Sequence, residues 1–247
     1  MQIAAYLKTS LIEWPGKISS VIFVSGCNFT CPFCHNPDLV NAGKNSIVPL
    51  LDSDGVLKDL KLRKQWSDAV VVTGGEPTLQ KDLILFLKKM GELGYLRMIH
   101  TNGTRPDVLK KLIDNKLVEY IAMDVKGDFG GYGRYTKVQS SKCKVQSYTK
   151  EVKISLKLIA ESGIEFELRT TVVPTLHTIE SLLLQAGEIQ EITKRGKDAP
   201  KWFLQQFRSI NTLDKSFLKI KPFSKEELLT FQKELQKVMP KTMLRGV

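Results

Sequence analysis

The sequence predicts an α/β protein whose core is a partial (β/α)6 barrel of parallel strands with outer helices. Two observations predict this fold. Short apolar segments rich in β-branched residues alternate with longer amphipathic segments, a pattern typical of parallel strands joined by helical crossovers. The pattern repeats about six times, which fits an open six-stranded barrel, and an open doubly wound sheet is the structural alternative.

The predicted strands are short, because a parallel strand buried on both faces reads as a brief apolar run. They cover residues 20–25, 69–73, 96–100, 120–124, 167–173 and 202–207. In the predicted helices, apolar residues recur at three- and four-residue spacing, as on one face of a helix. The predicted helices cover residues 56–65, 81–93, 106–115, 148–162, 179–193 and 225–238.

The chain of 247 residues is expected to form a single domain, because it is long enough to bury one large core. The barrel should occupy about residues 18–210, and residues 223–247 should add a helix and a short tail. Residues 127–146 are rich in glycine, lysine and serine, which predicts a long loop with a functional role over one end of the barrel.

The net charge is +11, but the lysines are scattered through the predicted helices and form no dense basic block. This distribution favours a solvated surface and argues against nucleic-acid binding. Every 18-residue stretch contains a charge, and the first ten residues do not resemble a signal peptide. We therefore expect no membrane association and a cytoplasmic location.

Three of the four cysteines, Cys27, Cys31 and Cys34, form a Cys-x3-Cys-x2-Cys pattern directly after the first predicted strand. In a parallel α/β fold this loop lies at the carboxyl ends of the strands, where active sites are built. A structural zinc site would need a fourth ligand such as His35 or Cys143, and a disulfide would leave one thiol over. An iron–sulfur cluster held by three thiolates would keep one iron open, and the spacing favours it. Cys143 is then expected to be a bystander.

Polar or glycine-rich segments also follow the next two predicted strands. Gly74 and Gly75 allow the backbone to approach a ligand closely, and the carboxylate of Glu76 can accept a charge-assisted hydrogen bond from an ammonium group. Thr101 and Asn102 follow the third predicted strand. If the strands are parallel, these residues lie at the same edge of the sheet as the cysteine loop.

Charged residues mark the fourth and fifth predicted strands. Asp124 and Lys126 are two residues apart and so share one side of a strand, where they could form an ordinary ion pair. Arg169 lies inside an apolar strand, where an unpaired charge is costly. It should therefore either pair with a buried acid or grip an anionic ligand, for which a guanidinium is well shaped.

The cysteine loop after the first strand resembles the signature of the radical S-adenosylmethionine (SAM) superfamily. The resemblance implies that Cys27, Cys31 and Cys34 hold a [4Fe–4S] cluster whose open iron binds the amino and carboxylate groups of SAM. Reductive cleavage of SAM would then give methionine and a 5′-deoxyadenosyl radical. The implied SAM contacts are Phe33, Gly74, Gly75, Glu76, Thr101, Asn102, Asp124, Lys126 and Arg169. For Phe33, which matches a position near the adenine, simple loop packing is the alternative.

Four segments are similar to anaerobic ribonucleoside-triphosphate reductase activating proteins, which are glycyl-radical-enzyme activases: residues 8–17, 34–38, 73–80 and 205–208. The similarity implies that the deoxyadenosyl radical takes a hydrogen atom from a backbone glycine of a partner enzyme. It also implies an electron donor such as flavodoxin or ferredoxin. Those activases often carry an aspartate before Thr-Asn-Gly, where this sequence has His100, and the departure leaves a monovalent-cation site unsupported.

Two other functions fit the same cysteine loop. One is a radical SAM enzyme that modifies a small molecule, such as a deazapurine or a tRNA precursor. The other is a zinc- or cluster-bearing binding module without catalysis. The sequence has no second cysteine cluster and no extra substrate domain after the barrel, which favours a protein substrate.

Overall fold

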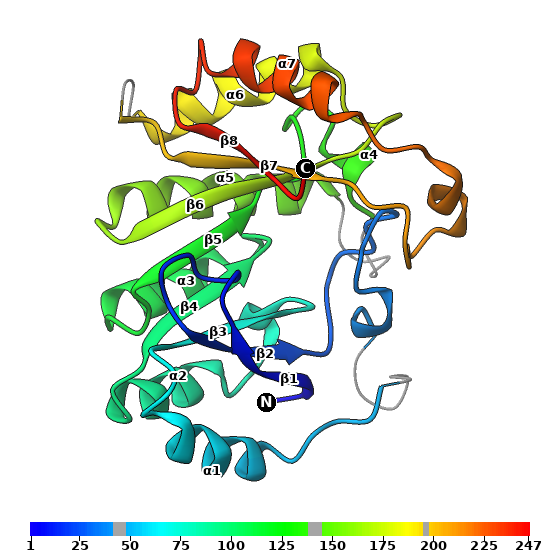
Figure 1. Cartoon of the computed structure of the whole chain (residues 1–247). Helices are drawn as coiled ribbons and strands as arrows, with labels where there is room; N and C mark the ends of the chain where they lie inside the picture. The colour runs from blue at the N-terminus through cyan, green and yellow to red at the C-terminus, as the bar shows by residue number, and fades with distance from the viewer. Residues whose placement is uncertain (42–47, 138–144, 195–197) are drawn as a thin grey trace. The chain divides into compact units, whose positions relative to one another are not determined.

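The computed structural model describes residues 1–41, 48–137, 145–194 and 198–247. Eight strands form one unclosed sheet in which the spatial order follows the sequence order from β1 to β8 (Figure 1). The strands are β1 (Ile3–Ser10), β2 (Ser19–Val24), β3 (Ala69–Gly74), β4 (Leu96–Thr101), β5 (Tyr120–Asp124), β6 (Glu165–Val172), β7 (Lys201–Gln206) and β8 (Thr242–Arg245). The helices are α1 (Ser53–Arg63), α2 (Leu83–Glu92), α3 (Pro106–Asp114), α4 (Tyr132–Tyr135), α5 (Val145–Glu161), α6 (Ile179–Thr193) and α7 (Lys225–Leu235).

The sheet is mostly parallel. β2 pairs in parallel with β3, β3 with β4, β6 with β7, and β7 with β8, whereas β1 runs antiparallel to β2. The strands β2 to β7, with helices between them, are the strand–helix units predicted from the sequence. The prediction of an α/β partial (β/α)6 barrel is therefore confirmed.

The sequence prediction was incomplete at the two ends of the sheet, since it named six strands and the sheet has eight. β1 lies in a segment for which no element was predicted, and β8 lies in the predicted tail. β1 is an outermost strand whose middle residues are mostly exposed, so its apolar pattern is weak. β8 has four residues, which is too short for a period of two to be recognised.

The long loop predicted over residues 127–146 is also interrupted by helices. The short helix α4 lies within it, and α5 begins at Val145 rather than at residue 148. Four residues are too few to show a helical period, so α4 gives no signal in the sequence. Cys143 lies outside the described residues. No helix in the described ranges is long and apolar enough to span a membrane.

The described chain divides into two compact units. Unit 1 comprises Met1–Asn28, Asp38–Thr101 and Asp107–Ala122, and unit 2 comprises Phe29–Pro37, Asn102–Pro106 and Met123–Val247. The single domain expected from the sequence stays a prediction.

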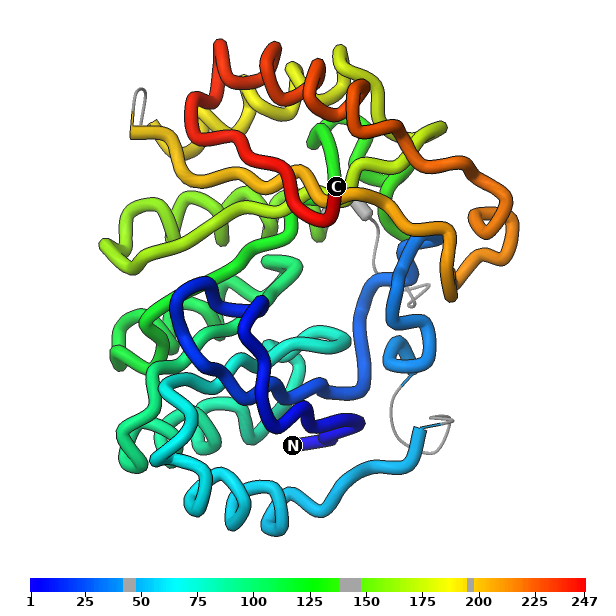
Figure 2. The backbone as a smooth tube through the Cα atoms, in the orientation of Figure 1, coloured from blue at the N-terminus to red at the C-terminus, as the bar shows by residue number. Residues whose placement is uncertain are grey.

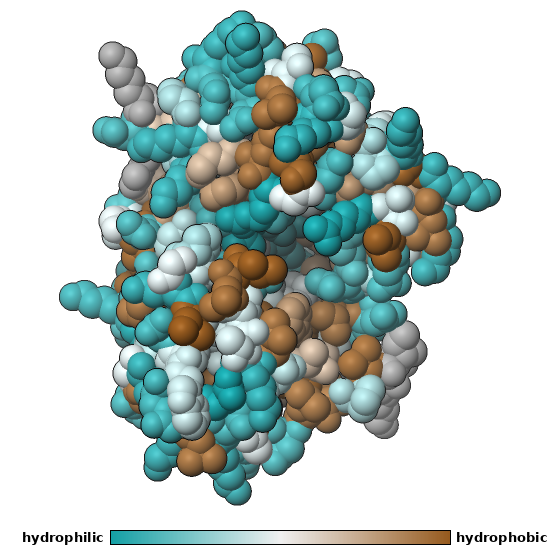
Figure 3. Space-filling model, in the orientation of Figure 1, coloured by the Kyte–Doolittle hydropathy of each residue, from teal (hydrophilic) through white to brown (hydrophobic). Residues whose placement is uncertain are grey.

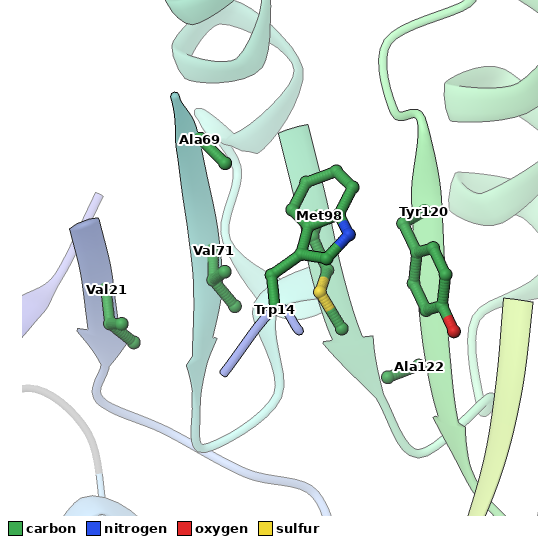
Figure 4. Packing of buried hydrophobic residues seen from close by; sticks show 7 residues of the cluster. All are labelled: Trp14, Val21, Ala69, Val71, Met98, Tyr120 and Ala122. Atoms are coloured by element: carbon green, nitrogen blue, oxygen red, sulfur yellow. The ribbon is translucent and has the colours of Figure 1, made fainter. Parts of the chain in front are cut away.

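Trp14 completes the core of unit 1 from the turn between β1 and β2. It packs against a buried cluster on β2 to β5, and its ring lies 5.6 Å from that of Tyr120, centroid to centroid (Figure 4). The other members of the cluster are Val21, Ala69, Val71, Met98 and Ala122. Ala69 and Val71, like Tyr120 and Ala122, are two residues apart on one strand and so share a face. One large indole thus fills the space in front of several strands.

We expect Trp14→Ala to lower the free energy of unfolding by about 3–5 kcal/mol, because loss of a buried indole leaves a cavity that the strands cannot fill. Chemical denaturation followed by circular dichroism measures the change. Trp66→Ala is the matched control, because Trp66 is 60% exposed and Trp14 only 8%. The control should change stability by less than about 0.5 kcal/mol. Equal effects of the two substitutions would contradict the packing role of Trp14.

A buried polar network ties together the strands and one helix of unit 2. Thr170 Oγ1 donates to the Val125 carbonyl at 2.7 Å and accepts from Trp202 Nε1 at 2.9 Å. Gln185 Nε2, on α6, donates to the Val125 carbonyl at 3.0 Å and to Thr170 Oγ1 at 2.9 Å. Buried polar groups are costly unless paired, so these bonds fix β6 in position. Because side chains alternate along a strand, Arg169 points to the opposite face from Thr170.

Candidate active site

The cysteine loop starts in unit 1, in contact with the glycine pair that follows β3. The Gly75 N–H donates to the Val24 carbonyl, and the Glu76 N–H donates to the Gly26 carbonyl, each at 2.8 Å. A Cβ at Gly74 would lie 2.5 Å from the Val24 nitrogen, and a Cβ at Gly75 would lie 2.1 Å from the Gly26 oxygen. The glycine pair therefore allows the chain that leads to Cys27 to pass in contact with the end of β3. Its predicted approach to SAM stays a prediction.

The carboxylate of Glu76 is buried at the end of β3 and held by three donors. Its Oε1 accepts from the Thr101 hydroxyl at 2.8 Å, from the Thr78 N–H at 3.0 Å and from the Thr78 hydroxyl. The structure thus brings together two predicted site residues, Glu76 and Thr101, at neighbouring strand ends. A carboxylate fixed in this way has a set direction in which to accept a hydrogen bond from an ammonium group.

His100, where the sequence departs from the activase pattern, lies on β4 in unit 1. Its Nε2 is 3.9 Å from the carboxylate of Glu13, which precedes Trp14 in the turn between β1 and β2. A protonated His100 would therefore form an ion pair with Glu13 at this strand end.

Cys31 and Cys34 lie in unit 2, and Cys31 is buried. The Cys34 N–H donates to the Cys31 carbonyl at 3.0 Å, which closes a tight turn between the two thiols. Burial raises the pKa of Cys31 to about 12 and also raises the pKa of Cys34. Both sulfurs therefore carry protons at neutral pH until a metal ion displaces them.

Asp124 and Lys126 form an ion pair at the end of β5 in unit 2, with 2.6 Å between Lys126 Nζ and Asp124 Oδ2. Burial alone would lower the pKa of Lys126, but the charge of Asp124 and its hydrogen bond to the ammonium outweigh it and raise that pKa above its ordinary value. Lys126 therefore stays charged close to Cys31. The strand-end ion pair considered from the sequence is present, and a contact with SAM stays a prediction.

The backbone of Lys126 is held on both sides by buried aromatic residues. Its N–H donates to Tyr132 Oη at 3.2 Å, and its carbonyl accepts from His177 Nε2 at 2.9 Å. His177 Nδ1 accepts from the Val173 N–H at 3.1 Å, which places the ring proton on Nε2. Burial lowers the pKa of His177 to about 4, so the ring is neutral at pH 7. His177 thus acts as a fixed donor that positions Lys126, a role that a lone histidine in the sequence did not reveal.

Under the prediction that Lys126 contacts SAM, we expect His177→Ala to weaken SAM binding about tenfold, the lower end of the range of about 10–100-fold that loss of an outer-shell partner costs a metal site. Calorimetric titration of the cluster-loaded protein with SAM measures the effect. His177→Gln, whose side-chain amide can still donate to the Lys126 carbonyl, should recover part of the affinity. Equal affinity of wild type and His177→Ala, with both proteins folded, would exclude the positioning role.

Arg169 lies in a buried ion-pair network on β6 to β8. Its Nε donates to Glu167 Oε1 at 2.5 Å, and Arg245 Nη1 contacts the same oxygen at 2.9 Å. Burial would raise the pKa of Glu167, but the two guanidiniums outweigh it and hold that pKa below its usual range. Arg245 also lies over the ring of Phe203, 3.8 Å from its centroid. The buried acid considered as a partner of Arg169 is therefore Glu167, and a grip on the SAM carboxylate stays a prediction.

Asn102 and Phe33 are both buried in unit 2. Asn102 Oδ1 accepts from the Thr104 N–H at 3.0 Å and from the Thr104 hydroxyl at 2.7 Å, which shapes the turn after β4. Phe33 is only 3% exposed, so it packs within the protein as the loop-packing alternative requires. Contact of either residue with SAM stays a prediction.

The residues present fit an iron–sulfur cluster, because the loop carries three thiols and thiolates are the usual ligands of such a cluster. Within the described ranges, no three His, Cys, Asp or Glu side chains lie close enough together to hold a metal ion. Gly26, with φ of +100°, turns the chain into the loop, and the ammonium of Lys126 offsets negative charge near Cys31.

Comparison with known proteins identifies the class. Residues 21–186 match the family described as the radical SAM superfamily. The chain therefore belongs to the radical SAM superfamily, whose members are enzymes that bind a [4Fe–4S] cluster and SAM.

Two relatives indicate the type of enzyme to which the chain is similar. It is 32% identical over 246 residues to the protein named "Putative glycyl-radical enzyme activating enzyme MJ1227" of Methanocaldococcus jannaschii, covering 99% of this chain and 96% of the relative. It is 30% identical over 174 residues to the pyruvate formate-lyase-activating enzyme of Clostridium pasteurianum, covering 67% of this chain and 66% of that enzyme.

Among solved structures, SuiB of Streptococcus suis bound to S-adenosylmethionine resembles this chain with a TM-score of 0.65 and 16% identity. The match covers 89% of this chain and 48% of SuiB. At this level of identity the likeness establishes the fold.

Proposed function

We propose that this chain is a glycyl-radical-enzyme activating enzyme. When bound and reduced, its [4Fe–4S] cluster supplies the one electron that cleaves SAM into methionine and a 5′-deoxyadenosyl radical. That radical takes one hydrogen atom from the Cα of a glycine in a partner protein, which gives 5′-deoxyadenosine and a glycyl radical. A ribonucleotide reductase of the anaerobic type is one partner that fits.

In this proposal the three thiolates of Cys27, Cys31 and Cys34 are the cluster ligands. Lys126 balances their negative charge, since its ammonium is held near Cys31 by Asp124. Glu76 accepts a hydrogen bond from the amino group of SAM, for which its carboxylate is already fixed by Thr101. Arg169, steadied by Glu167, binds the carboxylate of SAM.

The remaining proposed contacts arrange the ligand rather than neutralise its charge. Gly74 and Gly75 offer backbone groups at the end of β3, and Thr101 and Asn102 line the end of β4. Phe33 packs near the adenine, one residue before the last cysteine.

The full-length similarity to the Methanocaldococcus jannaschii relative carries the proposal, because it spans 99% of this chain. A similarity confined to the cysteine loop and the strand ends would support any radical SAM activity. The similarity to this relative instead extends through β8, so it covers the whole chain and not the cluster and SAM segments alone. It therefore favours a protein substrate over a deazapurine or tRNA precursor.

The proposal also includes partners and a location that follow from the chemistry. Reduction of the cluster requires a low-potential electron donor, such as flavodoxin or ferredoxin. We propose that this enzyme acts in the cytoplasm.

Anaerobic reconstitution followed by electron paramagnetic resonance tests the function. We expect about four irons per chain, as in a cubane cluster, and a spectrum of the reduced protein that changes when SAM is added. Incubation with SAM, a reductant and a glycyl radical enzyme from the same genome should then give a glycine-centred radical signal. Stoichiometric zinc without iron would support the binding module, and SAM cleavage that labels no such partner would support a small-molecule substrate.

A further inference from the structure

The segment after β7 forms an exposed strap beside the cysteine loop. We define the basic strap as residues 208–221, which include a short 3-10 helix at Lys215–Lys219. Both the strap and residues 29–37 of the cysteine loop belong to unit 2. Figure 2 shows this segment in orange, running beside the blue cysteine loop.

Direct contacts hold the basic strap to the cysteine loop. The Asp214 N–H donates to the Pro32 carbonyl at 2.9 Å, and Pro32 directly follows Cys31. At the start of the strap, the Arg208 N–H lies 3.4 Å from His35 Nε2, and His35 directly follows Cys34. The strap therefore contacts the cysteine loop between Cys31 and Cys34, at a backbone carbonyl, and directly after Cys34, at a side chain.

The charged side chains that the strap presents to solvent are mainly cationic. Arg208, Lys215, Lys219 and Lys221 are exposed, and Asp214 is the only acidic residue of the strap. A further exposed lysine, Lys137, adds to this charge. The Lys137 carbonyl accepts from the Thr30 N–H of the cysteine loop at 2.7 Å. Hydrogen bonds from Ser216, together with the charge of Lys137, hold the pKa of Asp214 below its usual range, so Lys137 lies near the strap.

Two apolar side chains are exposed among these cations. Ile210 is 70% exposed and Leu218 is 41% exposed. Figure 3 shows apolar side chains among hydrophilic ones over the segment that follows β7. Exposed apolar groups within a rim of like charges are a combination typical of a surface that binds another protein.

We propose that the basic strap is the docking surface for a small acidic protein that delivers one electron to the cluster. The redox cofactor of the donor protein would lose one electron. The cluster would gain that electron and pass from its 2+ to its 1+ state. This inference rests on the proposed function, because electron delivery matters only where a cluster is bound.

Charge and position favour an electron donor over the glycyl radical partner. A glycine must bring its Cα to the 5′ carbon of SAM, whereas an electron donor needs only to approach the ligand loop, which the strap contacts at Pro32. Electron-transfer complexes have small interfaces and short lifetimes. Opposite charges on the two proteins raise the rate at which they associate. The net positive charge of the strap complements an acidic carrier such as flavodoxin.

The test compares two triple variants with equal changes in charge. The strap variant is Lys215→Glu/Lys219→Glu/Lys221→Glu. The control variant is Lys58→Glu/Lys61→Glu/Lys88→Glu, which alters exposed lysines of α1 and α2 in unit 1. Binding of flavodoxin to each reconstituted protein is measured by surface plasmon resonance, and the rate of 5′-deoxyadenosine formation is measured with flavodoxin and, separately, with dithionite.

We expect the strap variant to lose about tenfold or more in flavodoxin association rate and in flavodoxin-driven SAM cleavage, because charge reversal at a docking surface acts mainly on association. The control variant should change by less than about twofold, and both should keep the dithionite-driven rate. Rising ionic strength should slow flavodoxin-driven cleavage in wild type and much less in the strap variant.

Two results would overturn the docking surface. One is a strap variant that binds flavodoxin and uses its electrons as wild type does. The other is a strap variant that keeps flavodoxin-driven SAM cleavage but no longer forms the glycyl radical, which would assign the strap to the partner enzyme. Failure of the proposed function is distinguishable, because wild type would then form no glycyl radical with either reductant.

Discussion

Replacing any one of Cys27, Cys31 and Cys34 with alanine is expected to abolish reductive cleavage of SAM. Three thiolates leave one iron open for SAM, so loss of a ligand should release iron or expose a second iron. Cluster binding to this loop must also displace the protons of its thiols, because thiolates are the ligands. Iron content and 5′-deoxyadenosine formation with dithionite measure the two consequences.

Cys143→Ala is the matched control for these substitutions, because the sequence predicts no ligand role for that cysteine. It should keep the iron content and cleavage rate of wild type. Full activity in any of the three loop variants would contradict the ligand assignment. Loss of activity in the Cys143 variant alone would point instead to a distant fourth ligand.

Substitution of Glu167 by alanine is expected to lower the free energy of unfolding by about 3–5 kcal/mol, the usual cost of removing one partner of a buried ion pair. Glu167 is 2% exposed and contacts both Arg169 and Arg245, so its loss leaves positive charge inside unit 2 without its counter-charge. Denaturation in urea measures the change. Glu165→Ala, on the exposed start of β6, is the control and should cost less than about 0.5 kcal/mol.

The pH dependence provides an independent check on Glu167. Its pKa is lower in the folded protein than the ordinary value, so the unfolded protein binds more protons in acid. The stabilisation by Glu167 is therefore fully present at neutral pH and is lost as the pH falls through the folded-state pKa. The stability difference between wild type and Glu167→Ala should shrink below about pH 4.3, the ordinary pKa of a glutamate. A difference that stays constant in acid would show that packing, and not charge, dominates.

The fold could be predicted largely because its main signals are local. Strands such as β3 are continuous apolar runs, and Ser224 caps α7 through a capping box with Glu227, which lies only three residues further along the sequence. β1 and β8 could not be predicted in this way. Each is specified mainly by its pairing with a neighbouring strand and has little apolar pattern of its own.

The residues of the candidate site likewise fall into two groups: those that local sequence signals could predict and those that depend on contacts between distant parts of the chain. The cysteine loop, Glu76 and Lys126 all follow strands closely and could be found from spacing and position. Glu167 could have been found too, since it lies two residues before Arg169 on the same side of a strand. Arg245 and His177 could not, because Arg245 reaches Glu167 from β8 and His177 contacts Lys126 across 51 residues of sequence. Only the folded chain brings such residues together.

Transfer of deuterium from glycine to SAM-derived 5′-deoxyadenosine tests the central claim most directly. A glycyl radical enzyme from the same genome would be produced with α-deuterated glycine and incubated with the reconstituted protein, SAM and dithionite. The proposed function predicts 5′-deoxyadenosine that carries one deuterium, together with a glycine-centred radical in the partner. 5′-Deoxyadenosine without deuterium, formed at an undiminished rate with every such partner, would contradict it.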